Sequence, residues 1–448
     1  MATLTKTENS FLTDLLEHQQ ELPESEPLLN TFRSKGAEEV RNMSFPTPKD
    51  EEWRFIKLRE LYEDQFVPAV SLSESEKLPD ISNYYLPESD GARLVFVNGA
   101  YSDELSTTEH LPDDLLIGNI GDLVGDETAA PLIEKHLNQY GDFEDDIFTS
   151  FNTAFLRDGP FIYLPDQLKV ETPVHLLFIQ TDASENYFLT PRCLIVAGKQ
   201  AELTLVEEHV GLSENKYFNL PVVEVNLEEN AYVKHTKIQR DSKRSIHFGR
   251  VGAHVRKHAN YESYTITLGA SLSRNEPRIT QLEEEVEFTV DGLVLINGNQ
   301  VSDTHSVMDH RKAFAESHQL HKCIVDDNAH SVFNGKIFVR QHAQKIDSFQ
   351  ENRNLLLSEK GMVDTKPQLE IFADDVKCTH GATVGQLDEN EVFYLKSRGL
   401  NENQARELLT YAFALETIEN ISVDSVQKLL VEEVRNFTDK QLDTKILA

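Results

Sequence analysis

The chain has 448 residues, enough for two or three domains and a large buried core. Its 76 Asp and Glu outnumber its 43 Lys and Arg, and the resulting net charge of −33 disfavours binding to nucleic-acid phosphates or anionic membranes. No apolar run approaches the ~20 residues that span a bilayer, so we expect no membrane-spanning helix.

Residues 1–158 are predicted to form a mixed, mainly helical N-terminal region. The predicted elements are short helices over 11–19, 37–43, 130–139 and 145–156, a strand over 94–97 and an exposed loop over 71–90. The segment 45–53 is stiffened by two prolines and carries the only tryptophan, Trp53. The N-terminus lacks the basic segment and apolar core of a signal peptide.

Residues 159–387 are predicted to form a long, uninterrupted series of short strands. Apolar and polar residues alternate at period two, which is the pattern of half-buried strands, and no long helical pattern occurs. The clearest strands cover 161–164, 174–179, 201–206, 231–238 and 261–268.

A polar residue followed by alanine opens several of these strands. The five pairs are Gln200-Ala201, Asn230-Ala231, His258-Ala259, Asn328-Ala329 and His342-Ala343. Their spacings are close to multiples of about 14 or 15 residues, as expected if each turn of a solenoid contributes one or two strands. Chance is the alternative origin of these pairs and a β-sandwich the alternative fold, but so long a run of strands favours the solenoid.

Residues 388–448 are predicted to form a C-terminal helical domain. Asp388 and Glu391 match a capping box, and Gly399 stands where a helix would end. Two later helices each carry an apolar stripe, which predicts packing within the domain, on a partner, or on both through different faces. The stripes are Ala405, Leu408, Leu409, Ala412 and Phe413 in one helix, and Val426, Leu430, Val434 and Phe437 in the other.

The chain lacks the common catalytic motifs. It contains no P-loop, no dinucleotide-binding G-x-G-x-x-G after a strand and no G-x-S-x-G. Without a C-x-x-C it also lacks a self-contained four-cysteine metal site. Its three cysteines, Cys193, Cys323 and Cys378, form no disulfide pattern, so we expect a cytoplasmic protein with reduced thiols.

Cys378 and His380 are the strongest candidates for chemistry. Their i, i+2 spacing places both side chains on one face of a strand, roughly 7 Å apart. A thiolate and an imidazole so placed can share a metal such as iron, or the imidazole can lower the thiol pKa to make a sulfur acceptor. A metal usually needs four ligands, so the others would come from elsewhere in the chain or from another subunit. A buried cysteine beside a hydrogen-bonded histidine is the purely structural alternative.

Many of the 16 histidines lie in the strand region, and we expect most of them on the surface or in strand ladders rather than as ligands. They are His235, His247, His254, His258, His305, His310, His318, His321, His330 and His342. A β-helix enzyme acting on carbohydrate is another hypothesis, because such enzymes use paired carboxylates. The adjacent pairs Asp145-Asp146, Asp326-Asp327 and Asp374-Asp375 support it weakly, since neighbours on a strand face opposite sides.

Several longer runs form a more specific pattern. They are P-K-D-E-E-W at 48–53, F-N-G-K-I at 333–337, K-P-Q-L-E-I at 366–371, D-D-V-K-C-T-H-G-A-T-V-G-Q-L-D at 374–388 and Y-L-K-S-R-G at 394–399. Together they resemble the SufB/SufD family, whose members build iron–sulfur clusters. The C-T-H-G-A-T form is similar to SufD, since SufB usually carries glutamate where this chain has Gly381.

The resemblance implies a right-handed parallel β-helix core flanked by helical regions. It also implies a non-catalytic scaffold subunit of the SUF complex, which pairs with a SufB-like homologue and docks SufC-type ABC ATPases. The missing P-loop fits, because the ATPase partner would hydrolyse ATP. A SufB-like homodimeric scaffold is the remaining alternative.

The resemblance further implies that Cys378 and His380 lie at the interface with the SufB-like subunit. There they would help to hold iron or a nascent cluster transiently, with no stably bound cofactor. It maps the ATPase docking surface onto residues 391–437, where the candidate contacts are Tyr394, Arg398, Leu408, Leu409 and Phe413.

Overall fold

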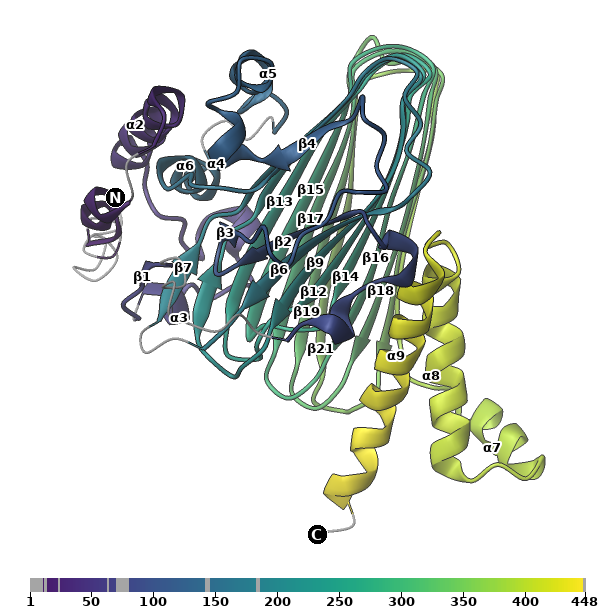
Figure 1. The fold of residues 1–448 in the computed structure, drawn as a ribbon. Coiled ribbons are helices and arrows are strands. Elements are labelled where there is room, and N and C mark those ends of the chain that lie inside the picture. Colours follow the sequence, from purple (N-terminus) through teal and green to yellow (C-terminus); the bar gives the residue numbers. More distant parts are fainter. Residues whose placement is uncertain are drawn as a thin grey trace.

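The structure, a computed structural model, describes residues 11, 14–22, 25–62, 64–69, 80–141, 146–182 and 186–445. Its core is a parallel β-solenoid of about seven turns, in which each turn adds one strand to each of two sheets (Figure 1). The predicted parallel solenoid is therefore confirmed and the sandwich is excluded. No helix in the described ranges is long and apolar enough to cross a membrane.

The first sheet has its main strands in the spatial order β21 (Met362–Ile371), β19 (His330–Val339), β17 (Val301–His310), β15 (Leu272–Gln281), β13 (Ile246–Val255), β11 (Val222–Leu227), β8 (Arg192–Ala197), β5 (Pro160–Leu164) and β4 (Leu116–Asn119). The short strands β1 (Val67–Pro68), β7 (Tyr187–Leu189) and β10 (Tyr217–Asn219) pair beside this path. The second sheet has the order β22 (Lys377–Gly385), β20 (Ile346–Leu356), β18 (Ala315–Val325), β16 (Val286–Ile296), β14 (Asn260–Thr267), β12 (Tyr232–Arg240), β9 (Glu202–Gly211), β6 (Val174–Gln180), β2 (Arg93–Val97) and β3 (Ala100–Tyr101).

One corner of the solenoid is built by a repeated backbone device. A non-glycine residue with positive φ precedes the second-sheet strand on seven successive turns. These residues are Gln167, Gln200, Asn230, His258, Glu285, Phe314 and Lys345. The N–H of Gln200, for example, donates to the carbonyl of Glu229 on the next turn at 3.0 Å. The corner residues thus satisfy their backbone groups by stacking on one another.

The predicted polar–alanine repeat corresponds to part of this corner. Ala201, Ala231 and Ala259 each follow a positive-φ residue, and all three are buried. Ala329 lies at the opposite corner, before β19, and Ala343 lies two residues before Lys345. The true repeat is therefore a backbone conformation, which alanine follows on only some turns.

The N-terminal helices cover the outer face of the first sheet (Figure 1). They are α2 (Pro27–Asn42), α3 (Arg59–Tyr62), α4 (Ile120–Leu123), α5 (Ala129–His136) and α6 (Ile147–Ala154), with the 3-10 turns η1 (His18–Glu21) and η2 (Glu51–Trp53). Two further 3-10 turns, η3 (Ser82–Tyr84) and η4 (Pro87–Ser89), lie beside the second sheet. The helix predicted over 37–43 is only the end of α2, which begins ten residues earlier at Pro27, a favourable first position. Residues 71–79 of the predicted loop lie outside the described residues.

The C-terminal helices are α7 (Glu389–Ser397), α8 (Glu402–Ile418) and α9 (Asp424–Lys445). The stripe predicted on α9 is confirmed: Val426, Leu430 and Val434 are buried in one cluster with outward side chains of the second sheet. In Figure 1, α8 and α9 run beside this sheet and α7 projects away from it.

The stripe predicted on α8 is divided between two faces. Leu408 and Ala412 are exposed, and the buried face of α8 is formed by Ala405, Thr410 and Ala414 together with Thr417 and Ile418. The predicted capping box at Asp388 and Glu391 is wrong, because the capping box lies at Asn401 and Gln404. Asp388 is an N-cap, as predicted, and its side chain accepts from the backbone N–H and the side-chain Nδ2 of Asn390.

Candidate functional site

Cys378 and His380 lie on β22, the last strand of the second sheet. In the parallel register Cys378 pairs with Ser348 and His380 pairs with Gln350. Ser348 and Gln350 are almost fully buried. Cys378 also packs against the hydrophobic core inside the solenoid. Both candidate side chains therefore extend the inward-facing row of β20, as their i, i+2 spacing predicted.

The solenoid is open at this end. β21 and β22 are the terminal strands of the two sheets, so neither has a strand on its outer side. Every residue of β22 is exposed except Cys378 and Gly381, which are partly buried. Large apolar side chains are exposed in the last turn as well: Met362 is 54% exposed and Phe372 59%. A strand of another chain can pair with such an unpaired edge and cover its exposed apolar side chains.

The Cys378 thiol is not activated in the isolated chain. Burial, followed by the nearby Asp347 carboxylate, raises the pKa of Cys378 to about 11. His380 is not among the causes of this shift, so the isolated chain gives no support to the alternative in which His380 lowers the pKa of Cys378. Deprotonation at neutral pH would need a further positive charge, such as a metal ion or a cation from another chain.

Cys378 and His380 do not form a complete metal site. Within the described ranges no three or more His, Cys, Asp or Glu side chains are grouped so that they could hold a metal ion. A soft thiolate and a borderline imidazole suit iron. The two side chains could serve iron or a cluster only together with ligands from another chain.

Beneath His380 lies a row of amides. Gln319, Gln350 and His380 occupy equivalent positions on β18, β20 and β22. Gln350 Nε2 donates to Gln319 Oε1 at 2.8 Å, and Gln319 Nε2 donates to Ser306 Oγ at 2.7 Å. Gly335 on β19 leaves room for Gln350, since a Cβ there would approach Gln350 Nε2 to 2.5 Å. His380 therefore stands on a rigid, hydrogen-bonded floor.

A second polar cluster lies deeper in the solenoid. Glu207 accepts hydrogen bonds from His209 Nε2 at 2.7 Å and His235 Nε2 at 2.9 Å. Although burial opposes it, the Lys237 ammonium and these hydrogen bonds hold the pKa of Glu207 well below its ordinary value. Glu207 shares the inward face of β9 with the core residue Leu205. The sequence did offer a signal for this cluster, because the residues at alternate positions of β9 change from apolar to charged.

Four of the strand-region histidines, which were expected on the surface or in strand ladders, lie on strands in the interior. His235, His247, His310 and His321 are buried. Burial lowers the pKa of His310 to about 4 and that of His321 to about 3, so both imidazoles are neutral at pH 7. Cys193 is buried in the core, as predicted, and Cys323 is buried too.

Of the three adjacent carboxylate pairs, the two that the structure describes in full lie in turns of the solenoid. Asp326 and Asp327 lie in the turn between β18 and β19, and Asp374 and Asp375 in the turn between β21 and β22. Asp145, from the third pair, lies outside the described residues.

The predicted docking residues differ in accessibility. Tyr394 is 55% exposed, and Arg398 lies over its ring at 5.0 Å. Leu408 is 44% exposed, but Phe413 is partly buried against the solenoid, where its carbonyl accepts from Lys322 Nζ at 2.8 Å. Leu409 is intermediate. Among the residues that the structure describes, Phe393 is the most exposed large apolar side chain, at 72%, and the sequence pattern did not single it out.

Comparisons with known proteins agree with this fold and sequence pattern. Residues 178–413 match the family model for the SUF system FeS cluster assembly SufBD core domain, and residues 5–176 match the SufBD protein N-terminal region. An iron–sulfur cluster assembly SufBD family protein from Synechocystis is 39% identical over 410 residues, covering 89% of each chain.

Two further relatives are named iron–sulfur cluster assembly protein SufD. The Escherichia coli protein is 30% identical over 89% of this chain and 90% of its own length. The Bacillus subtilis protein is 26% identical over 97% of this chain and 98% of its own length. The chain therefore belongs to the SufB/SufD family of iron–sulfur cluster assembly proteins, as a SufD-like member.

Proposed function

We propose that the chain is a non-catalytic scaffold subunit of an iron–sulfur cluster assembly complex, and that Cys378 and His380 form half of a site completed across a subunit interface. The observation that carries the proposal is the position of this pair on the unpaired terminal strand. Two donors that share an open edge, with no third donor grouped with them in the described part of the chain, fit a shared site.

The partner at the open end is a SufB-like solenoid. A homologous partner has an edge of the same geometry, so the two sheets can continue from one subunit into the other through backbone hydrogen bonds. The exposed apolar side chains of the last turn would then be buried. When this chain is alone, a second copy would cover the same edge as a homodimer.

The proposed cargo is iron or a nascent cluster, held transiently in a cytoplasmic protein. A bound metal cation would lower the pKa of Cys378 from about 11 and stabilise the thiolate as a ligand. His380, which is exposed at the same edge, would supply a nitrogen ligand.

A complex reconstituted with the SufB-like and SufC-type partners tests the shared site. His380→Ala should reduce cluster formation at least tenfold with the complex intact, and Cys378→Ala should reduce it less. Thr379→Ala is the matched control, because Thr379 is exposed on the same strand but faces away from the interior. Unchanged cluster and iron content in His380→Ala would refute the ligand role.

For the C-terminal helices we propose docking of a SufC-type ATPase. The support is the exposed apolar surface of α7 and α8, which includes Phe393, Tyr394 and Leu408. Deleting residues 401–448 would not test this cleanly, since it would uncover the cluster that α8 and α9 share with the second sheet. Tyr394→Ala combined with Leu408→Glu should weaken ATPase binding at least tenfold, whereas Glu419→Ala should not. Equal binding by all variants would refute the docking surface.

A further inference from the structure

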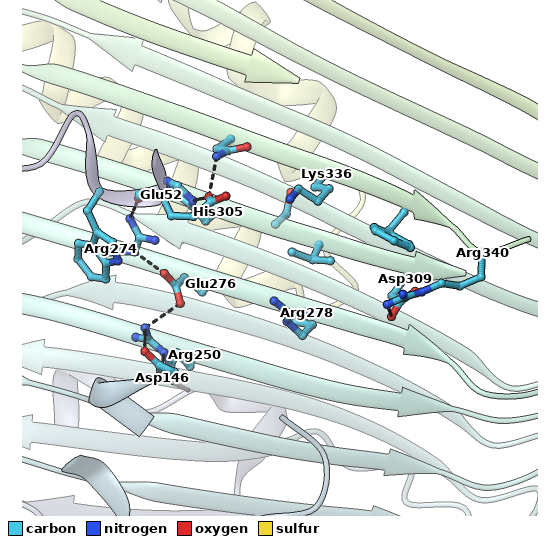
Figure 2. A pocket seen from close by; sticks show the side chains of 15 residues that line it. Glu52, Asp146, Arg250, Arg274, Glu276, Arg278, His305, Asp309, Lys336 and Arg340 are labelled. Atoms are coloured by element: carbon cyan, nitrogen blue, oxygen red, sulfur yellow. Dashed lines mark hydrogen bonds and ion pairs between the residues drawn. The ribbon is translucent and has the colours of Figure 1, made fainter. Parts of the chain in front are cut away.

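A cavity of about 390 Å³ lies on the outer face of the first sheet, away from the proposed cluster site (Figure 2). Side chains of β13, β15, β17 and β19 form its floor, and Glu52, Trp53 and Asp146 of the N-terminal region form one wall. The size is at the lower end for sites that bind small molecules. We call this cavity the sheet groove.

Two runs singled out by the sequence pattern meet in the sheet groove. The P-K-D-E-E-W run contributes Glu52 and Trp53, and the F-N-G-K-I run contributes Asn334 and Lys336. Asn334 Nδ2 donates to a Glu52 carboxylate oxygen at 2.9 Å, so the two runs are in direct contact. The proposed cluster site and docking surface do not use these residues.

In the half of the groove beside the N-terminal region, the charged side chains are paired with one another. Arg250 pairs with Asp146 and with Glu276 at 2.9 Å. His305 pairs with Glu52 at 3.0 Å, and nearby acidic groups outweigh burial and raise its pKa. Arg274, stacked 3.8 Å above Trp53, pairs with Asp303 at 2.6 Å. These groups neutralise one another and leave little capacity for a ligand.

The other half holds a cation whose side chain has no partner. Arg278 is half-buried, and no hydrogen bond or ion pair joins its guanidinium to any residue that the structure describes; Figure 2 shows it between the two ion-paired groups without a marked interaction. The register explains this, because Arg278 lies opposite Gly252 on β13 and Val307 on β17, neither of which can accept a hydrogen bond through its side chain.

Two further cations flank Arg278. Lys336 is in register with Val307 from the other side, so it lies two strands, about 10 Å, from Arg278 at the backbone. Its pair with Glu370, at 3.0 Å, is partly exposed and therefore weak. Arg340 lines the same end of the groove, where it pairs with Asp309 at 3.0 Å.

We propose that the sheet groove binds a small molecule bearing a phosphate or carboxylate group, held by Arg278 together with Lys336 and Arg340. A guanidinium presents its N–H groups as a planar fork that matches an oxyanion, and the bond is strengthened by charge on both partners. A partly desolvated guanidinium without a partner is costly, so binding an anion removes that cost. The nearly 10 Å between the strands of Arg278 and Lys336 suits one anionic group between two long side chains.

Trp53 provides the assay, because it is the only tryptophan of the chain and lines the groove. The full-length protein is titrated with inorganic phosphate, and separately with malonate, at constant ionic strength set by sodium chloride. We expect a saturable change in tryptophan fluorescence and a matching heat in calorimetry. Tighter phosphate binding would indicate a phosphate ester as ligand, and tighter malonate binding a carboxylate.

Arg278→Gln should weaken binding of the preferred anion at least tenfold, and Lys336→Gln should weaken it severalfold. Arg435→Gln, which removes a 71% exposed arginine on α9, should leave the affinity unchanged. No described side chain loses an interaction partner when Arg278 is replaced, so the replacement should not impair folding. The midpoint of unfolding checks this. The proposal is overturned if neither anion gives a saturable signal by either method, or if Arg278→Gln binds as well as the wild type.

Discussion

Replacing Gly335 by alanine should disturb the floor of the cluster site. The added Cβ would lie 2.5 Å from Gln350 Nε2 and 2.5 Å from the Phe333 ring, closer than carbon atoms approach in proteins. Overpacking of this kind costs about 1–3 kcal/mol. Displacing Gln350 also weakens its 2.8 Å hydrogen bond to Gln319, worth about 1 kcal/mol. Gly335→Ala should therefore lower the free energy of unfolding by about 2–4 kcal/mol.

The matched control is Gly381→Ala, on β22 in the next turn of the solenoid. A Cβ at Gly381 meets nothing within 4 Å, and this glycine has no positive φ. Its replacement should be neutral or stabilise by less than about 1 kcal/mol. Urea unfolding, followed by circular dichroism, gives both changes from the shift in midpoint and the wild-type slope. If the two variants differ by less than about 0.5 kcal/mol, the close packing around Gly335 is refuted.

Three further predictions concern buried groups. Burial lowers the folded-state pKa of His321 to about 3, so the neutral imidazole contributes to the free energy of unfolding above pH 6.5, and this contribution is lost as the pH falls. Between pH 7.5 and 5 the free energy of unfolding of His321→Gln should therefore fall by about 2 kcal/mol less than that of the wild type, and equal losses would contradict this. Lys322→Met should destabilise α8 by about 1–3 kcal/mol, because the buried ammonium bonds to the Phe413 carbonyl and to Glu416; faster proteolysis within α8 checks this, and unchanged cleavage would count against it. Without a partner, the rate at which iodoacetamide alkylates Cys378 should rise about tenfold per pH unit toward its pKa of about 11, and mass spectrometry showing a plateau below pH 9 would disprove the raised pKa.

The sequence predicted the strand period and the solenoid, because alternation at period two records which side chains face the interior. It predicted the repeat only in part. The corner conformation is defined by φ, and side chains as different as Asn230, Phe314 and Lys345 adopt it once the neighbouring turn supplies a hydrogen-bond acceptor. A motif of residue types therefore misses turns that a motif of backbone angles includes.

The spacing of Cys378 and His380 correctly placed both on one strand face, but it did not reveal the open edge, which depends on where the solenoid stops. The stripe on α8 left its buried face undecided for a related reason. Leu408 is apolar yet exposed, whereas Thr410 and Thr417 are buried where the helix lies against the solenoid. Which face of a helix is covered depends on the sheet beneath it, and helical periodicity alone does not contain that information.

The most direct test of the account is hydrogen exchange along β22 in the presence and absence of the SufB-like partner. If the open end is the interface, amides of residues 377–385 should exchange at least tenfold more slowly in the complex, while the interior strand β13 should be unchanged. A stable complex in which β22 exchanges as fast as in the isolated chain would contradict a shared site at Cys378 and His380.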